Sequence, residues 1–536
     1  MNRTLTSLGV LILIVAAAAT IRLVHLDNRP MHTDEAVHGA KFGPLLEKGI
    51  YEYDPHEFHG PTLNYLTIPV VRMGGGNTIA QTTEVQLRIV PAICGILLIA
   101  GLWIIRDAIG LGAMLCAAAL CAASPAMIFY SRYYIQEMLL ICFTFFAIAA
   151  FWRSAQKGTV AKFVWLAIAG FSIGLMHATK ETCIIALFAM FAGGIYVAVL
   201  SLIAGNGWTR QKMISLSITG GVVLVAAALV SVTLFSSLFT HPAGISDSIT
   251  SIAGYVTRSG GEGSAGNHSY PWYNYLRIVC WWQDGEGPVW TEMLVVILAV
   301  VGLIAGLIGK GCGKASIPFV RFLGVYTIVM TVGYSYLSYK TPWCLLGFFH
   351  GMLLLAGIGA AVLWRAARPA PIKALVAVML LVAGGHLAWQ GWRGSFPQCA
   401  DPDNPYVYAH TTHDVPKLAN LIREIALEHP DQKAMCIQIV GPEYAHWPLP
   451  WYLRDFTKID WYGNAQPDPL IVVRPEDDIF QTLLNLPRAY THVKPENKDP
   501  KTDRKWWELR PNIWLEMRVE PDLFKKYKAS HPNQTE

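Results

Sequence analysis

Two short stretches near the start of the chain hold residue types that suit proton transfer. The first, M-H-T-D-E-A-V-H-G, follows a long apolar stretch and contains the adjacent acids Asp34 and Glu35. A carboxylate beside a membrane can take a proton from a hydroxyl group, because a medium of low polarity raises its pKa toward the useful range. Asp34 and Glu35 are therefore the candidate catalytic residues.

The second stretch, Y-D-P-H-E-F-H-G-P, contributes His56 and His59, and the first contributes His32 and His38. Imidazoles next to carboxylates suit a divalent metal such as Zn²⁺ or Mn²⁺. Hydrogen bonding within the loop, or contact with a substrate, accounts for the same four residues. No cofactor is certain from the sequence, and a divalent metal stays open.

Composition indicates which elements must position these residues. Of the 536 residues, 53% are hydrophobic and only 15% are charged, against about 25% charged in an ordinary soluble domain. The mean hydropathy is +0.36. These values exclude a single soluble globule, and the net charge of +5, spread over the chain, predicts no nucleic-acid partner.

Apolar stretches close to the membrane-spanning length of ~20 residues predict about eleven transmembrane helices. If these helices span the bilayer, membrane lipids surround most of the chain. The predicted helices lie at about 5–24, 87–105, 111–130, 135–152, 163–179, 183–203, 213–236, 290–309, 321–338, 343–363 and 374–391.

Charge divides the chain into two domains, 1–392 in the membrane and 393–536 outside it. The second holds 39 charged residues among 144, and the first holds 40 among 392. With the N-terminus in the cytoplasm, the inner segments carry 13 Lys or Arg and one acid, Asp107. The positive-inside rule favours this orientation, which places loops at about 25–86 and 237–289 on the extracytoplasmic side together with the C-terminal domain.

The C-terminal segment has the patterns of a small α/β domain. Residues 413–428 have the apolar period of an amphipathic helix, and 434–440 and 469–473 read as buried strands between turns. The predicted fold class is a polytopic α-helical membrane protein with a soluble α/β domain on the outer face.

Two further acids lie at predicted helix ends beside cations, namely Glu137 near Arg132 and Glu181 next to Lys180. Ionisable groups close to a membrane are costly, and a functional role is the first hypothesis for them. A structural ion pair explains the same placement, and the sequence leaves both readings open.

Several motifs resemble those of the GT-C glycosyltransferases, which move a sugar from a polyprenyl-phosphate carrier to an acceptor on the outer face. S-R-Y-Y-I-Q-E (131–137), T-K-E (179–181) and Y-K-T-P-W (339–343) are similar to segments of the protein O-mannosyltransferases. H-G-P-T-L (59–63) resembles the H-P-P-L motif of that family and of the aminoarabinose transferases, with glycine in place of the first proline. The D-E-A-V-H-G stretch most resembles a prokaryotic GT-C-like family described as flippase-activity-associated.

The resemblance implies an inverting transfer at a prokaryotic cytoplasmic membrane. Asp34 would act as base on an acceptor hydroxyl, and the acceptor would be a protein, a lipid or a glycan. A polyprenyl phosphate needs no acid to depart, and cations would stabilise its charge. The residues implied are Arg132, Lys180 and Lys340 for the donor phosphate, and Glu137, His59, His56 and Glu181 for substrate positioning.

Two other classes of function stay open. A flippase or transporter for lipid-linked sugars would have internal repeats and charges at the membrane midplane, whereas these acids lie at the predicted outer side. A non-catalytic partner of an outer-face assembly would use the C-terminal domain as its docking surface.

Overall fold

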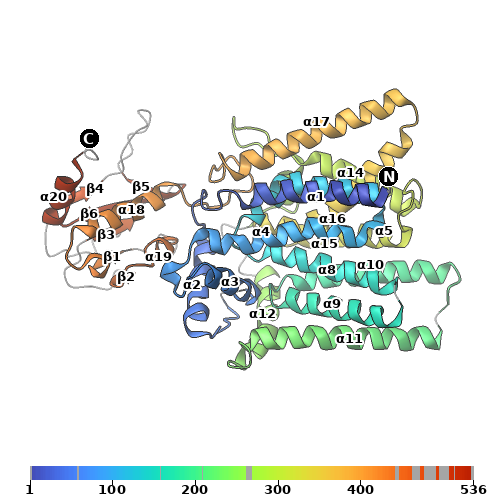
Figure 1. Ribbon diagram of the computed structural model, residues 1–536, viewed down its shortest axis with the longest axis horizontal. Coiled ribbons are helices and arrows are strands. Elements are labelled where there is room, and N and C mark those ends of the chain that lie inside the picture. The colour runs from blue at the N-terminus through green and yellow to red at the C-terminus, as the bar shows by residue number, and fades with distance from the viewer. Residues whose placement is uncertain are drawn as a thin grey trace.

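The computed structural model describes residues 3–56, 59–156, 158–207, 209–260, 269–440, 446–461, 471–475, 491–493, 506–511 and 513–532. Long helices lie side by side in a bundle, and a smaller domain with a sheet lies beyond one end of it (Figure 1). We call this end of the bundle the domain end. The N-terminus lies at the opposite end.

Each of the eleven predicted apolar stretches is helical, and the chain is a polytopic α-helical membrane protein. Among the described residues, nine helices are long and apolar enough to cross a membrane, or ten if α6 and α7, which meet at 61°, form one span. α14 is apolar but shorter. The helices are α1 (Arg3–Leu23), α4 (Glu84–Gly101) with η2 (Leu102–Ile105) and α5 (Arg106–Ile109), α6 (Leu111–Ala123), α7 (Pro125–Ser131), α8 (Glu137–Ala155), α9 (Thr159–His177), α10 (Cys183–Ile203), α11 (Arg210–Phe235), α14 (Met293–Ile308), α15 (Ile317–Tyr336), η4 (Pro342–Leu345) with α16 (Leu346–Ala366), and α17 (Ala370–Ser395).

Small residues let two of these helices approach closely. A Cβ atom on Gly302 of α14 would lie 2.1 Å from the carbonyl oxygen of Leu355 in α16, and one on Gly359 would lie 1.9 Å from that of Leu298. Glycines at a helix crossing allow backbone-to-backbone packing, as in many membrane bundles. α16 is thereby held in the centre of the bundle, where most of its residues are buried.

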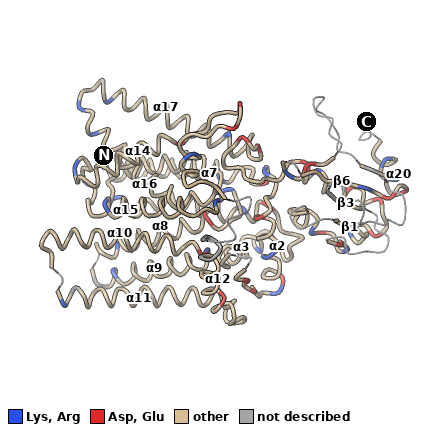
Figure 2. Tube along the Cα trace, turned by 180° about the vertical axis from the view of Figure 1, so that it is seen from behind, with Lys and Arg blue, Asp and Glu red and all other residues tan. Residues whose placement is uncertain are grey.

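Short helices cover the domain end. α2 (Thr33–Lys48), α3 (Thr62–Met73) and η1 (Ile79–Gln81) lie between α1 and α4, and α12 (Ala243–Gly260) and α13 (Asn274–Cys280) lie between α11 and α14. Figure 2 shows many carboxylates at the domain end, whereas Lys and Arg mark the opposite end. This is the charge asymmetry on which the predicted orientation depends.

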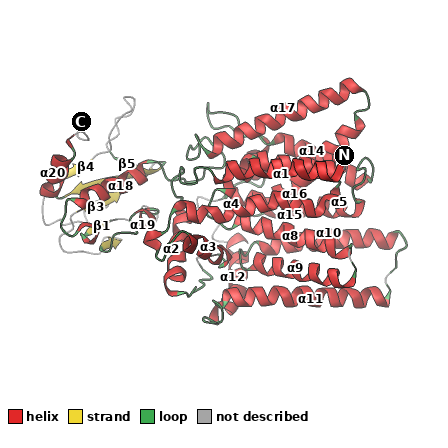
Figure 3. Cartoon of the chain, in the orientation of Figure 1, coloured by secondary structure: helices red, strands yellow, loops and turns green. Residues whose placement is uncertain are grey.

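The C-terminal domain has a mixed sheet with helices beside it (Figure 3). The strand order is β2-β1-β3-β6-β4, and β5 also pairs with β6. β1 is parallel to β2 and β3, and β6 is antiparallel to its neighbours. The predicted helix corresponds to α18, the predicted strand 434–440 contains β1, and the predicted strand 469–473 overlaps β3. The elements are α18 (Asp414–Leu427), η5 (Gln432–Ala434), β1 (Ile437–Ile439), α19 (Leu449–Tyr452), β2 (Ile459–Trp461), β3 (Ile471–Pro475), β4 (Thr491–Val493), β5 (Trp507–Arg510), β6 (Ile513–Val519) and α20 (Pro521–Ser530).

Hydrogen bonds join the C-terminal domain to the domain end. The Tyr130 hydroxyl donates to the carbonyl of Tyr406 (2.9 Å), in the segment 396–413 that follows α17. The backbone N–H of Met31 donates to the Tyr452 hydroxyl (2.8 Å). Both bonds are buried, so residues of the two domains share one interior.

Candidate active site

Asp34 and Glu35 begin α2 in opposite environments. The backbone N–H of Asp34 donates to Nδ1 of His32 (3.0 Å), and Glu35 accepts from the backbone N–H of His32 (3.1 Å), which forms a capping box. Carboxylates in a first turn are favoured by the partial positive charge of the helix end. The side chain of Asp34 is 41% exposed, whereas that of Glu35 is fully buried.

Glu35 is held by two arginines. It accepts hydrogen bonds from Arg29 (3.2 Å) and from two nitrogens of Arg88 (2.8 and 2.7 Å), and from the backbone N–H of Tyr134 (2.8 Å). Burial alone would raise the pKa of Glu35, but the positive charges of Arg88 and Arg29 and these bonds lower it well below its usual range. The geometry gives Glu35 the role of joining α2 to α4.

Arg132 lies in the turn between α7 and α8 and faces the end of α1. Its guanidinium donates to the backbone carbonyls of Ile21 (3.0 Å), Arg22 (3.3 Å), Val24 (2.7 Å) and His25 (2.7 Å). The last carbonyls of a helix have no partner within it, and such a side chain satisfies them. The predicted phosphate ligand thus caps α1, which engages both terminal nitrogens of its guanidinium.

Lys180 and Glu137 form a buried ion pair. Lys180 lies in the turn between α9 and α10, and its Nζ donates to Oε1 of Glu137, the first residue of α8. Burial lowers the pKa of Lys180, but the adjacent Glu137 carboxylate raises it above its usual value, so the ammonium stays charged. The pair joins the ends of three membrane helices.

Glu181 connects the first loop to the turn between α9 and α10. Its carboxylate lies 2.7 Å from Nδ1 of His59 and accepts from the Tyr53 hydroxyl (3.1 Å). Burial raises the pKa of Glu181, but His59, a backbone hydrogen bond and Lys180 together outweigh this and lower it to about 2. Gly60 allows the contact, because a Cβ there would lie 2.2 Å from the carbonyl oxygen of Ala178. The glycine that departs from the H-P-P-L motif is therefore required by packing.

His38 lies between Asp34 and these ion pairs. Its ring centroid is 6.1 Å from that of His59, and Gln136 lies 3.4 Å from its Nδ1. Burial lowers the pKa of His38 to about 3, with a further contribution from His59, while Asp34 raises it and Lys180 lowers it. His38 is therefore neutral near pH 7, and it lies close enough to Asp34 and Lys180 to interact electrostatically with both.

Lys340 lies in the turn that follows α15. Its Nζ donates to the carbonyl of Leu337 and lies 5.8 Å from the centre of the Tyr275 ring. Farther along α15, an apolar groove of about 180 Å³ opens between α14, α15 and α16. Its lining includes Val296, Leu303, Thr331, Val332 and Leu355.

The candidate metal ligands are spread over the domain end. His32 packs against His410, His38 lies near His59, and His56 is exposed, its backbone N–H donating to Asp54 (2.8 Å). Within the described ranges, no three His, Cys, Asp or Glu side chains converge as ligands of one ion. The described geometry assigns no residue to a metal.

The C-terminal domain contributes residues that sequence reasoning missed. The charge of Asp34 acts on Arg510 at the end of β5, and on Tyr408 in the segment after α17. Burial lowers the pKa of Arg510, and Asp34 partly offsets this. The neighbouring His410 is buried against His32, with ring centroids 5.1 Å apart. The aromatic run Y-V-Y-A-H at 406–410 was the only signal in the sequence.

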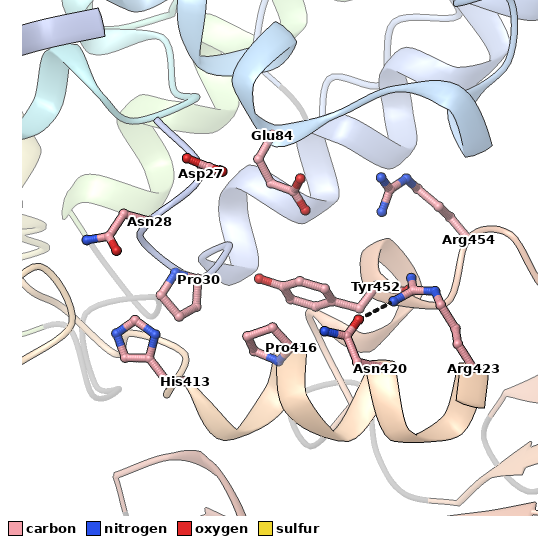
Figure 4. A pocket seen from close by; sticks show the side chains of 10 residues that line it. All are labelled: Asp27, Asn28, Pro30, Glu84, His413, Pro416, Asn420, Arg423, Tyr452 and Arg454. Atoms are coloured by element: carbon pink, nitrogen blue, oxygen red, sulfur yellow. Dashed lines mark hydrogen bonds between the residues drawn. The ribbon is translucent and has the colours of Figure 1, made fainter. Parts of the chain in front are cut away.

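A polar cavity of about 310 Å³ lies between the two domains, and none of the predicted site residues lines it. Figure 4 shows Asp27, Glu84 and Tyr452 around it, with Arg423 and Arg454 from the C-terminal domain. Both guanidiniums already have partners, Asp455 for Arg423 (3.2 Å) and the carbonyl of Thr82 for Arg454 (2.6 Å). The cavity is part of the junction between the domains.

Comparison with known proteins identifies the fold. Residues 72–232 match the family model of the dolichyl-phosphate-mannose-protein mannosyltransferases. No curated protein matches the sequence significantly. The fold resembles that of ArnT from Cupriavidus metallidurans bound to undecaprenyl phosphate, with a TM-score of 0.63 and 14% identity, covering 95% of this chain and 98% of that one.

A second similar structure is the oligosaccharyltransferase AglB from Archaeoglobus fulgidus, in complex with an inhibitory peptide and a dolichol-phosphate. The TM-score is 0.59 at 13% identity, over 88% of this chain and 69% of that one. The chain therefore has the GT-C fold, as the sequence motifs predicted.

Proposed function

We propose that this protein is an inverting glycosyltransferase of the extracytoplasmic face, with a polyprenyl-phosphate sugar as donor. The acceptor hydroxyl attacks the anomeric carbon while Asp34 takes its proton, and the bond from that carbon to the phosphate oxygen breaks. The phosphate leaves as an anion, so one base suffices. The GT-C fold and the polyprenyl phosphates in two structures of that fold support this class of donor.

The contrast between Asp34 and the other acids carries the assignment of the base. Of the four predicted carboxylates, Glu35, Glu137 and Glu181 are buried against Arg29 and Arg88, Lys180 and His59. Asp34 is partly exposed, and among the described residues its ion-pair contact is with the His32 ring, at 3.8 Å. That ring nitrogen accepts the N–H of Asp34, so it carries no proton, and the carboxylate is left available for a proton.

The donor phosphate has two candidate cations, Lys180 and Lys340. Lysine binds phosphate as a point charge, and Glu137 orients the first of these through the buried pair. α15 leads from the apolar groove to Tyr336, four residues before Lys340. A prenyl tail in that groove would place its phosphate near this lysine.

The other predicted residues have positioning roles in this proposal. Glu181 and His59 hold the first loop against the turn before α10, and Glu35 fixes the start of α2 and hence the position of Asp34. Arg132 holds the end of α1, from which the first loop begins, through its hydrogen bonds to the last carbonyls of that helix. His56 is exposed in the same loop and stays a candidate contact for the acceptor.

Transfer of labelled sugar from a polyprenyl phosphate to envelope acceptors tests the proposal. Asp34→Asn keeps the shape of the side chain and removes the base, and we expect turnover to fall by at least about a hundredfold. Asp107→Asn, at the opposite end of the bundle, is the matched control. Full turnover in folded Asp34→Asn would exclude this base. Movement of the carrier lipid across the membrane without a glycosidic product would favour the flippase alternative.

A further inference from the structure

Beside Asp34, the ring of His32 has a hydrogen-bond donor without an acceptor. Its Nδ1 accepts the backbone N–H of Asp34, so in the neutral ring the proton must be on Nε2. Burial lowers the pKa of His32, which keeps the ring neutral. Nε2 is buried and has no hydrogen-bond partner among the described residues.

His410 repeats this arrangement from the other domain. Its Nδ1 accepts the backbone N–H of Tyr408 (3.2 Å), which again places the proton on Nε2. This Nε2 is buried and, as far as the structure is described, without a partner. Each of the two imidazoles therefore has a buried N–H donor, not an acceptor, without a partner among the described residues.

Two more unused donors adjoin the rings. The Tyr133 ring lies 5.6 Å from both His32 and His410, and the Arg29 guanidinium lies 4.3 Å from the Tyr133 ring centre. The Tyr133 hydroxyl and Nε of Arg29 are both buried and unpartnered in the described part of the chain. A buried donor without an acceptor is unfavourable, so four together indicate an absent acceptor.

The charges around the cluster favour a negative acceptor. Arg29, Arg88 and Arg510 act on the two imidazoles, together with the carboxylates Asp34 and Glu35. Arg132 lies close enough for its charge to interact with those of Arg29 and Arg88. On the two imidazoles themselves, three positive groups act against two negative ones, and this excess of positive charge in a medium of low polarity attracts an anion.

We propose that Arg29, His32, Tyr133 and His410 form a binding site for an oxyanion, a carboxylate or phosphate oxygen. The site adjoins Asp34, and the donor-phosphate candidates Lys180 and Lys340 are not part of it. This inference rests on the proposed function, and it assigns the anion to the sugar acceptor. The sugar acceptor is then an acidic molecule with its carboxylate or phosphate near the hydroxyl that Asp34 deprotonates.

Calorimetric titration of the full-length protein in detergent tests the site without any transfer reaction. The probes are sodium acetate and inorganic phosphate, with chloride as the anion that lacks oxygen. We expect saturable binding of at least one oxyanion. The probe that binds more tightly, acetate or phosphate, indicates whether the site takes a carboxylate or a phosphate group. Equal binding of chloride, or no saturable binding, would overturn the site.

Two conservative variants locate the binding. Tyr133→Phe removes one hydroxyl and keeps the ring, and His410→Asn can retain an acceptor for Tyr408 while removing the Nε2 donor. Each should weaken oxyanion binding about tenfold, the equivalent of one hydrogen bond to a charged group. Tyr65→Phe in α3 is the control, because that hydroxyl already donates to Ser237 (3.1 Å), and its affinity should match the wild type. Unchanged affinity in both test variants, or a high-resolution map with only ordered water between the rings, would contradict the proposal.

The acceptor is tested separately in the transfer assay. An acidic acceptor should have a lower KM than its neutral amide or ester, and Tyr133→Phe should reduce that difference with little change in kcat. Oxyanion binding without this preference for acidic acceptors would overturn the acceptor assignment, while the oxyanion-binding site itself would still stand. Transfer that is absent for every acceptor, with binding intact, would instead count against the proposed function.

Discussion

Two adjacent acids of one dipeptide have different tasks in this protein. Glu35 is enclosed by Arg29, Arg88 and a backbone N–H, whereas the side chain of Asp34 is partly exposed. A buried carboxylate is expensive unless it is paired. Glu35 therefore contributes to the stability of the fold, and the role of catalytic base is proposed for Asp34.

Stability and activity should separate between these two residues. Glu35→Gln leaves two buried guanidiniums without their carboxylate, and we expect a loss of about 3–5 kcal/mol in the free energy of unfolding. Asp34→Asn changes a partly exposed group and should cost about 1 kcal/mol or less. Thermal unfolding in detergent checks both, and similar losses would contradict the assignment.

The pair of Glu181 with His59 should show in the pH dependence of stability. Burial raises the pKa of Glu181, but His59, with smaller contributions from a backbone hydrogen bond and Lys180, lowers it to about 2, below the ordinary value of about 4.3 for an unfolded chain. A depressed pKa adds stability above pH 4.3, and that contribution is lost as the pH falls toward 2. The difference in stability between wild type and Glu181→Gln should shrink from pH 5 to pH 3. A constant difference would show that the pair contributes little.

At the scale of elements, close backbone contacts bring the site together. Gly60 packs the first loop on the turn after α9, and the N–H and hydroxyl of Thr62 both donate to the carbonyl of Ala178 (3.0 and 2.7 Å). This contact seats α3 against α9. His59 and Glu181 can meet because the two segments lie at that distance.

Gly60→Ala should separate these segments. The added methyl group would meet a backbone carbonyl, which cannot rotate away, and we expect a loss of about 1–3 kcal/mol. Gly158→Ala is the control, since nothing lies within 4 Å of a Cβ there; it should change stability by about 0.5 kcal/mol or less. Unfolding midpoints measure both, and equal midpoints would show that the loop adapts.

At the scale of the whole molecule, the candidate site is built by both domains. Tyr408, His410 and Arg510 reach the surroundings of Asp34 from beyond α17. The Met31–Tyr452 and Tyr130–Tyr406 bonds keep the domains together. Motion of the C-terminal domain would therefore change the environment of the proposed base.

Arg510→Gln tests this dependence. The charges of Arg510 and Asp34 interact, and removing this cation beside the proposed base should lower kcat/KM by about tenfold. Arg518→Gln in β6, whose guanidinium pairs with Glu516 (3.0 Å), is the control in the same domain. An unchanged kcat/KM in Arg510→Gln would limit the C-terminal domain to a structural role.

The sequence by itself determined the membrane helices, the elements α18, β1 and β3, and the GT-C class, because apolar period and short motifs are local properties. Only the tertiary structure decided which acid of Asp34 and Glu35 is paired, because that depends on the rotation of α2 against Arg88 in α4. It also turned Arg132 toward the carbonyls of α1, and brought His410 to His32 across more than 370 positions of the chain. Contacts between distant segments depend on how helices pack, and no spacing along the chain encodes them.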